Sequence, residues 1–256
     1  MIFAGVDSGS RSVKAVLLDG LGMRVIDSGV VDQGVGHQAI ASQLLASLLE
    51  RQGLSAKDVG GVVATGYARE SVIEADVAVT EITCHARGVH HLHGDARTVI
   101  EIGGQDSKVL HLEPDGTVRD FVMNDRCAAG TGRFLELVAR RLGKDIHELD
   151  GLSALDVKPL PISSTCVVFA ETEIIGLLAG GAGTDEILAG VQKAIASRLT
   201  TMSGRLRKAV VFTGGVAMVA NMSNMLSRAL GVEVVVPSQP QLTGALGAAI
   251  IAASAR

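Results

Sequence analysis

Residues 2–18 read IFAGVDSGSRSVKAVLL, in which two apolar segments flank a short run of small polar residues. The first segment ends at Asp7, and the second extends from Val13 to Leu18. Apolar segments of this length, separated by Gly and Ser, are typical of two antiparallel strands joined by a tight turn. The segment therefore predicts a β-hairpin that carries an acidic residue at its turn.

The same pattern is repeated in residues 99–112, VIEIGGQDSKVLHL. When Asp7 is aligned with Glu101, Lys14 falls on Lys108. Each copy is followed by segments with the apolar spacing of helices and by further short apolar segments. The repeat predicts that the chain consists of two related lobes.

The segments that follow the two hairpins alternate between helical and strand patterns. Helices are expected over residues 38–51, 134–142, 187–206, 221–230 and 243–253, and strands over residues 59–65, 209–213 and 233–236. This alternation predicts an α/β fold. The first lobe is expected over residues 1–95 and the second over residues 96–242, with the C-terminal helix, residues 243–256, packing back on the first lobe.

The composition excludes several classes of protein. Of the 256 residues, 47% are hydrophobic and 20% are charged, and the net charge is -4. These values are typical of a globular protein with no general attraction for nucleic acid. The sequence has no apolar run of about 18 residues and begins without a signal peptide, so we expect a cytoplasmic protein that does not bind membranes. Its three cysteines are expected to be reduced or metal-bound rather than paired as disulfides.

The two hairpin turns have the composition of phosphate-binding sites. DSGS at residues 7–10 and GGQD at residues 103–106 each expose several backbone N–H groups, which can bind phosphate oxygens. Either turn alone is explained equally well as an ordinary hairpin. Facing each other across a cleft, with Asp7 and Asp106 holding Mg²⁺ through water, the two turns would form a nucleotide clamp. A third turn, TGGV at residues 213–216, can pass close to a nucleoside, and neither GxxxxGK[ST] nor GxGxxG occurs in the chain.

Cys127 and Cys166 each stand where a helix is expected to begin. The positive end of a helix lowers the pKa of a thiol and stabilises a metal–thiolate cluster. Two such thiols suggest half of a metal site, and the alternative is that both are small buried apolar residues. Cys84 is expected to be a packed thiol.

Four histidines, His85, His90, His91 and His93, follow Cys84 within a short segment. Their spacing matches no usual structural zinc site. The segment is expected to be a solvated, partly helical linker between the lobes.

Three turns of this kind, in this order, resemble the ATPase fold that actin, sugar kinases, acetate kinase and heat-shock chaperones share. The resemblance covers almost the whole chain and implies a two-lobed, actin-like ATPase of duplicated ribonuclease H-like domains. Within the clamp, Asp7 and Asp106 are expected to hold Mg²⁺ and the attacking water. Phosphates are expected at Ser10, Ser12, Lys14, Gly104 and Gln105, and adenosine along Gly214, Gly215 and Val216.

Three longer motifs carry a narrower resemblance: IEIGGQDSK at residues 100–108, NDRCAAGTGRFLE at residues 124–136 and CVVFAETE at residues 166–173. Together they resemble the activator component of 2-hydroxyacyl-CoA dehydratases. This component belongs to the BadF/BadG/BcrA/BcrD ATPase family, which also includes ATPase subunits of benzoyl-CoA reductase. TEITCHA at residues 80–86 is similar to the same family, in which its cysteine is not a cluster ligand.

This resemblance implies a homodimer in which Cys127 and Cys166 of both subunits hold one four-iron four-sulfur (4Fe-4S) cluster. It also implies that ATP hydrolysis drives an electron from reduced ferredoxin or flavodoxin through the cluster to a separate dehydratase, in anaerobic metabolism. Asn124 and Arg126 are expected to shield the cluster or to dock the partner.

Two other classes of function stay open on the sequence alone. A small-molecule kinase of the same fold would bind its substrate between the lobes and would need no iron–sulfur cluster. A nucleotide-gated binding module would hydrolyse ATP without a redox cofactor. Neither class explains why two cysteines stand at expected helix starts.

Overall fold

A computed structural model describes residues 1–34, 36–125, 127–151, 157–163 and 166–255. The chain divides into two compact units. The first unit contains Met1–Arg97, Leu112–Asp120 and Gln241–Arg256, and the second contains Thr98–His111 and Phe121–Pro240. Each unit is therefore assembled from segments that are not contiguous in the sequence.

The first unit is built on a mixed sheet with the strand order β3-β2-β1-β4-β5. The strands are β1 (Ile2–Ser8), β2 (Ser12–Asp19), β3 (Arg24–Asp32), β4 (Val59–Thr65) and β5 (Val77–Ala78). β1 pairs antiparallel with β2, as the sequence predicts, and parallel with β4. The edge strand β3 was missed by the sequence analysis, because its residues are mostly half-buried or exposed and lack a continuous apolar run.

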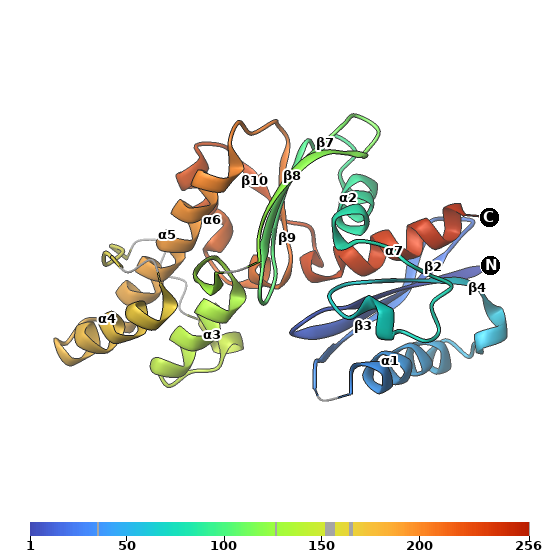
Figure 1. Cartoon of the computed structure of the whole chain (residues 1–256), viewed down its shortest axis with the longest axis horizontal. Helices are drawn as coiled ribbons and strands as arrows, with labels where there is room; N and C mark the ends of the chain where they lie inside the picture. The colour runs from blue at the N-terminus through green and yellow to red at the C-terminus, as the bar shows by residue number, and fades with distance from the viewer. Residues whose placement is uncertain (35, 126, 152–156, 164–165, 256) are drawn as a thin grey trace. The chain divides into compact units, whose positions relative to one another are not determined.

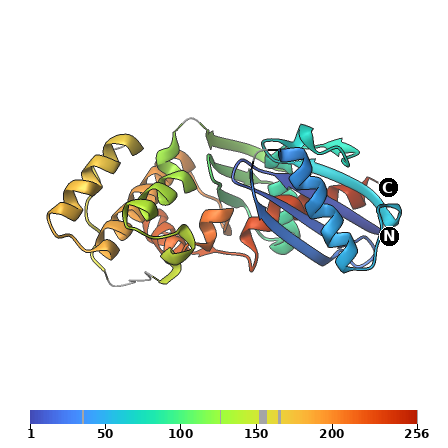
Figure 2. The same ribbon diagram turned by 90° about the horizontal axis from the view of Figure 1, so that it is seen from below.

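Helices cover both faces of this sheet (Figure 1, Figure 2). They are α1 (His37–Arg51), α2 (Glu81–Leu92) and α7 (Thr243–Ser254). α1 packs on the face of β2 that carries Ala15 and Leu17, whereas α7 packs on the face that carries Val16 and Leu18. Alternation of side chains along β2 thus places the sheet between α1 and α7, and α2 packs on α7.

Glycines allow α7 to approach its neighbours closely. A Cβ atom on Gly5 of β1 would lie 2.0 Å from the carbonyl oxygen of Ala245, and one on Gly247 would lie 1.7 Å from that of Cys84. Both distances are far below van der Waals contact, so only glycine fits at these positions. The small residues of the C-terminal segment therefore make α7 part of the core of the first unit.

The histidine-containing segment is not the solvated linker that the sequence analysis expects. It forms α2, in which His85 is 5% exposed and Cys84 is fully buried. The helix begins after Thr80, whose side-chain oxygen accepts a hydrogen bond from the Thr83 N–H. The helical part of the expectation is confirmed, whereas the solvated linker was wrong, because one side of this helix packs against α7. The expectation that Cys84 is a packed thiol is confirmed.

The second unit repeats the first sheet strand for strand, in the order β8-β7-β6-β9-β10. Its strands are β6 (Thr98–Ile102), β7 (Ser107–Leu112), β8 (Val118–Asn124), β9 (Val210–Thr213) and β10 (Val234–Val235). β6 pairs antiparallel with β7 and parallel with β9. Asp7 faces Lys14 across the first hairpin, and Glu101 faces Lys108 across the second. The repeat predicted from the sequence is therefore a repeat of topology and register.

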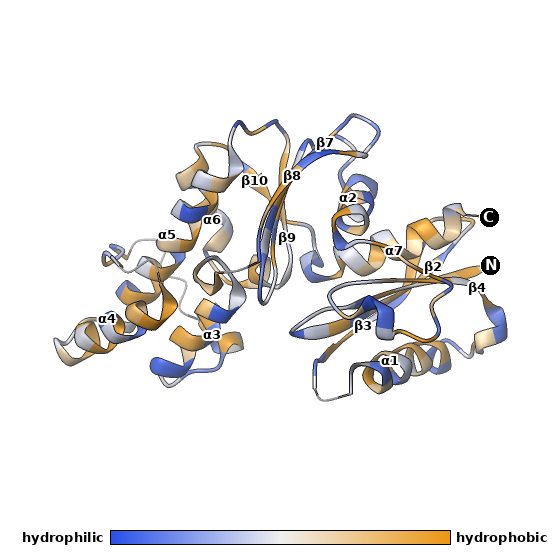
Figure 3. Cartoon of the chain, viewed as in Figure 1, coloured by the Kyte–Doolittle hydropathy of each residue, from blue (hydrophilic) through white to orange (hydrophobic). Residues whose placement is uncertain are grey.

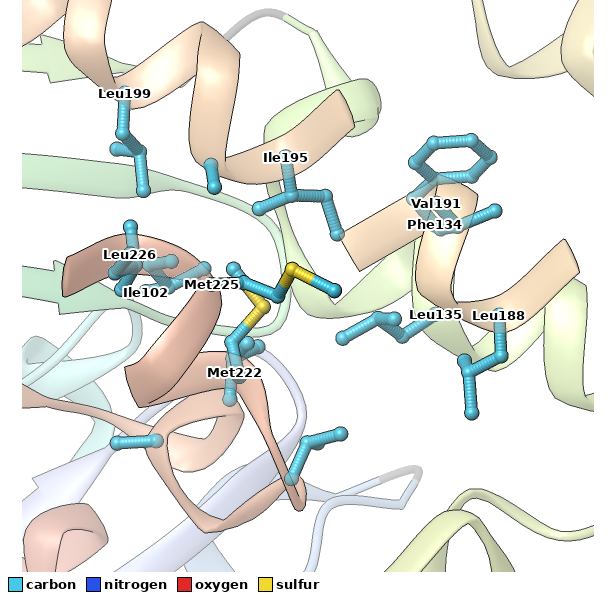
Figure 4. Packing of buried hydrophobic residues seen from close by; sticks show 14 of the residues in the cluster. Ile102, Phe134, Leu135, Leu188, Val191, Ile195, Leu199, Met222, Met225 and Leu226 are labelled. Atoms are coloured by element: carbon cyan, nitrogen blue, oxygen red, sulfur yellow. The ribbon is translucent and has the colours of Figure 1, made fainter. Parts of the chain in front are cut away.

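Four longer helices accompany this second sheet. They are α3 (Gly132–Arg141), α4 (Val167–Ala179), α5 (Thr184–Ser203) and α6 (Met222–Leu230). Their core brings together Ile102 of β6, Phe134 of α3, Ile195 of α5 and Met222 of α6 (Figure 4). Within the described segments, no helix has the length and the apolar character needed to cross a lipid bilayer.

Candidate functional site

Asp7 and Lys14 form an ion pair at the turn of the first hairpin. Asp7 lies near the end of β1, and the Lys14 Nζ atom is 3.2 Å from its Oδ2 atom. Both side chains are largely buried, and the hairpin register places them directly opposite each other. The pair fixes the Asp7 carboxylate at the strand end, where a metal-bound water could be oriented.

The turn that follows Asp7 is tight and contains the predicted phosphate contacts. The Gly9 N–H donates to the carbonyl oxygen of Ser12 at 3.2 Å, and Ser10 at the bend is half-buried. Gly66, after β4, lies against this turn, because a Cβ atom there would be 2.5 Å from Asp7 Oδ1. Its φ of +96° also favours glycine. Two chain segments therefore meet at Asp7.

His85 is a neighbour of Asp7 that the sequence analysis missed. Its Nδ1 atom lies 3.0 Å from Thr243 Oγ1. A Cβ atom on Gly244 would lie 3.1 Å from His85 Nε2 and 3.4 Å from Asp7 Oδ2, so both groups border the same glycine. The spacing of the histidines could not predict this contact, because Thr243 and Gly244 belong to α7, which lies near the other end of the sequence.

Glu101, Asp106 and Lys108 form the corresponding cluster in the second unit. The Lys108 Nζ atom lies 2.9 Å from Glu101 Oε2 and 2.7 Å from Asp106 Oδ2. Lys108 is 2% exposed, so its ammonium is satisfied by these charge-assisted hydrogen bonds rather than by water. Asp106, the predicted Mg²⁺ residue, is thereby held at the turn, next to Gly104 and Gln105.

The two units also share a Thr-Gly pair at the end of a parallel strand. Thr65 faces Asp7 in the register of β1 and β4, and Thr213 faces Glu101 in that of β6 and β9. The glycine after each threonine has a positive φ, +96° for Gly66 and +91° for Gly214. Gly66 packs against Asp7, and Gly214 packs against Glu101. Only the second copy was predicted to be a ligand-binding turn, although VVATG at residues 62–66 and VVFTG at residues 210–214 are a visible repeat.

The turns predicted for phosphate and for adenosine meet at the start of α3. The N–H groups of Gly132 and Arg133 donate to the carbonyl oxygens of Gly103 and Gly104, each at 2.9 Å. A Cβ atom on Gly132 would lie 3.1 Å from the Gly103 oxygen and 3.4 Å from Val216 Cγ2. The structure therefore brings these two predicted turns together.

Gly214, Gly215 and Val216 occupy different environments in the third turn. The Gly214 N–H donates to the carbonyl oxygen of Pro240 at 3.0 Å, and Val216 is 3% exposed. A Cβ atom on Gly215 would meet nothing within 4 Å. Gly215 is therefore the residue of this turn with open space for a ligand.

Cys127 is half-buried and precedes the short 3₁₀ turn η3 (Ala128–Gly130) rather than an α-helix. This corrects the expected helix start, because α3 begins only at Gly132. The Arg198 Nη2 atom lies 3.3 Å from the Cys127 Sγ atom, and the Asn124 Nδ2 group donates to the Cys127 carbonyl oxygen at 2.9 Å. Asn124, which was predicted to shield the cluster or to dock the partner, thus contacts this cysteine, whereas Arg126 lies outside the described residues.

Cys166 is exposed and caps α4, as the sequence predicts for a helix start. The helix is apolar along most of its length (Figure 3). α7 is similarly apolar but buried, whereas Val168 and Phe169 of α4 are 67% and 69% exposed. Among the described residues of one chain, α4 thus keeps an apolar face uncovered beside Cys166.

Comparison with known proteins identifies the family that shares this arrangement. A sequence model of the BadF/BadG/BcrA/BcrD ATPase family matches residues 4–252. The chain belongs to this family. It is 41% identical to the 2-hydroxyisocaproyl-CoA dehydratase activator of Clostridioides difficile, over 98% of this chain and 95% of that protein. It is 43% identical to the activator of lactoyl-CoA dehydratase of Anaerotignum propionicum, over 98% of this chain and 97% of that protein.

Solved structures agree with this membership of the BadF/BadG/BcrA/BcrD family. The activator of the 2-hydroxyisocaproyl-CoA dehydratase from Clostridium difficile, with bound ADPNP, has a TM-score of 0.95 at 40% identity. The match covers 100% of this chain and 95% of that one. A ROK family glucokinase from Streptomyces griseus shares the fold alone, with a TM-score of 0.58 at 14% identity, over 99% of this chain and 100% of that one. The predicted actin-like α/β ATPase fold is confirmed.

The described residues of this BadF/BadG/BcrA/BcrD family member were searched for groups of side chains that could bind a metal ion. In that part of the chain, no group of three or more His, Cys, Asp and Glu side chains could hold a metal ion. Cys84 does not add to the set, because burial raises the pKa of its thiol to about 12. Of the three cysteines, Cys127 and Cys166 are therefore the two whose thiols are not fully buried.

Proposed function

We propose that this ATPase is an ATP-driven electron donor that activates a 2-hydroxyacyl-CoA dehydratase or a related acyl-CoA reductase. The observation that carries the proposal is the exposed thiol of Cys166 at the start of an apolar helix, in a chain whose relatives are dehydratase activators. A small-molecule kinase has no evident use for a thiol on an exposed apolar face. Reduced ferredoxin or flavodoxin is the proposed donor, and the cytoplasm the proposed compartment.

The nucleotide is proposed to bind at the hairpin turns. Asp7 and Asp106 hold Mg²⁺ and orient the attacking water, with their lysine partners fixing both carboxylates. Phosphate contacts come from Ser10, Ser12, Lys14, Gly104 and Gln105, and adenosine lies along Gly214, Gly215 and Val216. The tight Gly9 turn and the open space at Gly215 support this assignment. That the turns of the two units face each other across a cleft stays a prediction.

One 4Fe-4S cluster per homodimer is proposed to be held by Cys127 and Cys166 of both copies. The donor set fits, because such a cluster takes four thiolates and each chain supplies two that are not buried. The Arg198 guanidinium adds a positive charge beside the Cys127 sulfur. When bound, the cluster would supply a one-electron carrier whose potential depends on hydrogen bonds to its sulfurs and on exposure.

The second copy is proposed to cover the apolar face of α4. Val168 and Phe169 lie two and three residues after Cys166, so the contact that buries them also brings the thiols of two chains towards one axis. Burial of large apolar side chains at the centre of an interface is a main source of its stability.

Metal content tests this proposal. The protein is purified without oxygen, and iron, sulfide and molecular mass are measured for the wild type, Cys166→Ser and the matched control Cys84→Ala. We expect about two irons and two sulfides per chain in a dimer, lost in Cys166→Ser and kept in Cys84→Ala. A protein that hydrolyses ATP but takes up no iron after reconstitution would refute the proposal and favour a kinase or a nucleotide-gated binder.

A further inference from the structure

His85 is a buried polar side chain for which the proposed reaction has no use so far. It lies on α2, is 5% exposed, and its Nδ1 atom is 3.0 Å from Thr243 Oγ1. Thr243 is itself fully buried, at the start of α7. Because α2 packs on α7, this contact fixes the direction of the imidazole ring. A buried ring of this kind is retained at a cost in desolvation, which favours a role for its second nitrogen.

The second ring nitrogen, Nε2, lies near the carboxylate of Asp7. A Cβ atom on Gly244 would be 3.1 Å from His85 Nε2 and 3.4 Å from Asp7 Oδ2, so one methyl group there would touch both atoms. The absence of a side chain at residue 244 therefore leaves room for the ring and the carboxylate at the start of α7. Asp7, His85 and Gly244 all belong to the first compact unit, which therefore contains the whole arrangement.

The two carboxylate oxygens of Asp7 have different surroundings. Oδ2 lies on the side of His85 and of Lys14, whose Nζ atom is 3.2 Å away. Oδ1 lies on the side of the phosphate turn, 2.5 Å from the position of a Cβ atom on Gly66 and 3.6 Å from that of one on Gly9. Donors that hold one oxygen of a carboxylate also fix the direction of the other. Groups at Oδ2 thus determine where Oδ1 points.

Lys14 has two proposed tasks, whereas its counterpart in the second unit has one. Lys108 is 2% exposed and is hydrogen-bonded to both Glu101 and Asp106. The side chain of Lys14 is 16% exposed, and its ammonium is a proposed phosphate contact as well as the partner of Asp7. A second donor beside Oδ2 would keep the Asp7 carboxylate in place while the ammonium contacts phosphate.

We propose that His85 is a positioning residue for ATP hydrolysis, which donates a hydrogen bond from Nε2 to Asp7 Oδ2 and so keeps Oδ1 directed at the phosphate turn. An ionised carboxylate only accepts hydrogen bonds, so a neutral ring carries its proton on Nε2. Nδ1 then accepts the hydrogen bond that the Thr243 hydroxyl donates. The inference rests on the proposed function, because it depends on the role assigned there to Asp7.

The first measurement needs no nucleotide and no activity. In the full-length protein labelled with ¹⁵N-histidine, the imidazole signals of His85 are identified by their loss in His85→Asn. We expect the shift of a protonated Nε2, which changes in Asp7→Asn but not in the control Asp58→Asn, since Asp58 is exposed and directly precedes β4 at the end remote from Thr65. A proton on Nδ1 alone, or signals that are the same in Asp7→Asn, would overturn the proposal.

The second measurement compares two amide side chains at residue 85. In His85→Gln the amide nitrogen can take the place of Nε2, whereas in His85→Asn it reaches only the place of Nδ1. We expect the kcat of ATP hydrolysis to fall at least about tenfold in His85→Asn and to be largely restored in His85→Gln. The KM for ATP and the affinity for a non-hydrolysable ATP analogue should change less than about threefold. Equal losses of kcat in the two variants, or no loss in either, would contradict the proposal, because packing alone would then explain His85.

Thr243 gives an independent pair of variants should those at residue 85 fail to fold. Thr243→Val exchanges the hydroxyl for a methyl group of similar size, and Thr243→Ser keeps the hydroxyl. The kcat should fall several-fold in Thr243→Val alone, because the ring is then no longer held; an unchanged kcat there would count against the proposal.

Failure of the proposed function gives a different pattern. If the wild type hydrolyses no ATP, that function is wrong, whereas the ring signals still decide whether His85 binds Asp7. Full hydrolysis in His85→Asn combined with its loss in Asp7→Asn would leave the proposed nucleotide site intact and refute the role of His85.

Discussion

At the scale of single residues, the two buried acid–lysine pairs are related but not equivalent. Lys108 is 2% exposed and holds two carboxylates, Glu101 and Asp106. The side chain of Lys14 is 16% exposed, and its ion pair is with Asp7. An ammonium held between two carboxylates is a poor phosphate ligand, so the asymmetry favours Lys14 for the phosphate contact and Lys108 for fixing Asp106.

Cys84 leads to a prediction about alkaline pH. Burial raises the pKa of its thiol from 9.0 to about 12 in the folded protein. As the pH rises, the Cys84 thiol therefore loses its proton in the unfolded chain before it does so in the folded protein. The contribution of this thiol to folding stability is complete below pH 9 and decreases as the pH rises to about 12. The slope should be about 1.4 kcal/mol of unfolding free energy per pH unit in that window.

Urea unfolding of the wild type and Cys84→Ala between pH 8 and about 11 measures this effect. Other groups titrate in both proteins, so the informative quantity is the difference between the two curves. We expect the stability advantage of the wild type to shrink with rising pH. A difference independent of pH would contradict the prediction.

At the scale of secondary-structure elements, the sequence predicts those helices and strands whose apolar residues recur with a clear period. The first hairpin, β4, α1 and α7 lie within a few residues of their expected bounds, because their apolar faces are continuous. β3 and β8 were missed, because edge strands that are largely exposed have no apolar run. The helix over residues 187–206 ends earlier, at Ser203, where Gly204 adopts a positive φ.

The packing of α7 gives a prediction at the same scale. Gly247→Ala would place a Cβ atom 1.7 Å from the Cys84 carbonyl oxygen, which belongs to the backbone of α2 and cannot move alone. The helices must separate, so we expect a loss of at least about 3 kcal/mol of unfolding free energy, the upper range for overpacking.

The matched control is Gly176→Ala in α4, another helical glycine, where a Cβ atom meets nothing within 4 Å. Alanine has the higher helix propensity, so this variant should be stabilised by up to about 1 kcal/mol. Urea unfolding of both variants gives the comparison. Equal effects would mean that α2 and α7 are not packed as tightly as the structure places them.

At the scale of the whole molecule, the repeat could be predicted from the hairpins, whereas the site residues supplied by distant segments could not. His85 and Gly244 meet beside Asp7 only because α2 packs on α7, and no local pattern encodes that contact. The link between Gly132 and Gly103 likewise depends on tertiary packing. The lobe boundaries at residues 95 and 242 stay predictions.

The exposed apolar face of α4 leads to a prediction about how two copies of the chain assemble. Phe169 is 69% exposed, so Phe169→Ser removes little packing within one chain and should leave that chain folded. If a second copy covers this face, the variant should become monomeric, lose its iron and still bind ATP. Leu21→Ser is the matched control, since Leu21 is 91% exposed in the turn between β2 and β3.

Light scattering with iron analysis of both variants decides the point. Loss of dimer and iron in Phe169→Ser alone would assign the interface to α4 and link the metal site to it. A Phe169→Ser dimer with full iron would place the contact between copies elsewhere. The proposed shared cluster would then require Cys166 to meet the partner through a contact that does not depend on Phe169.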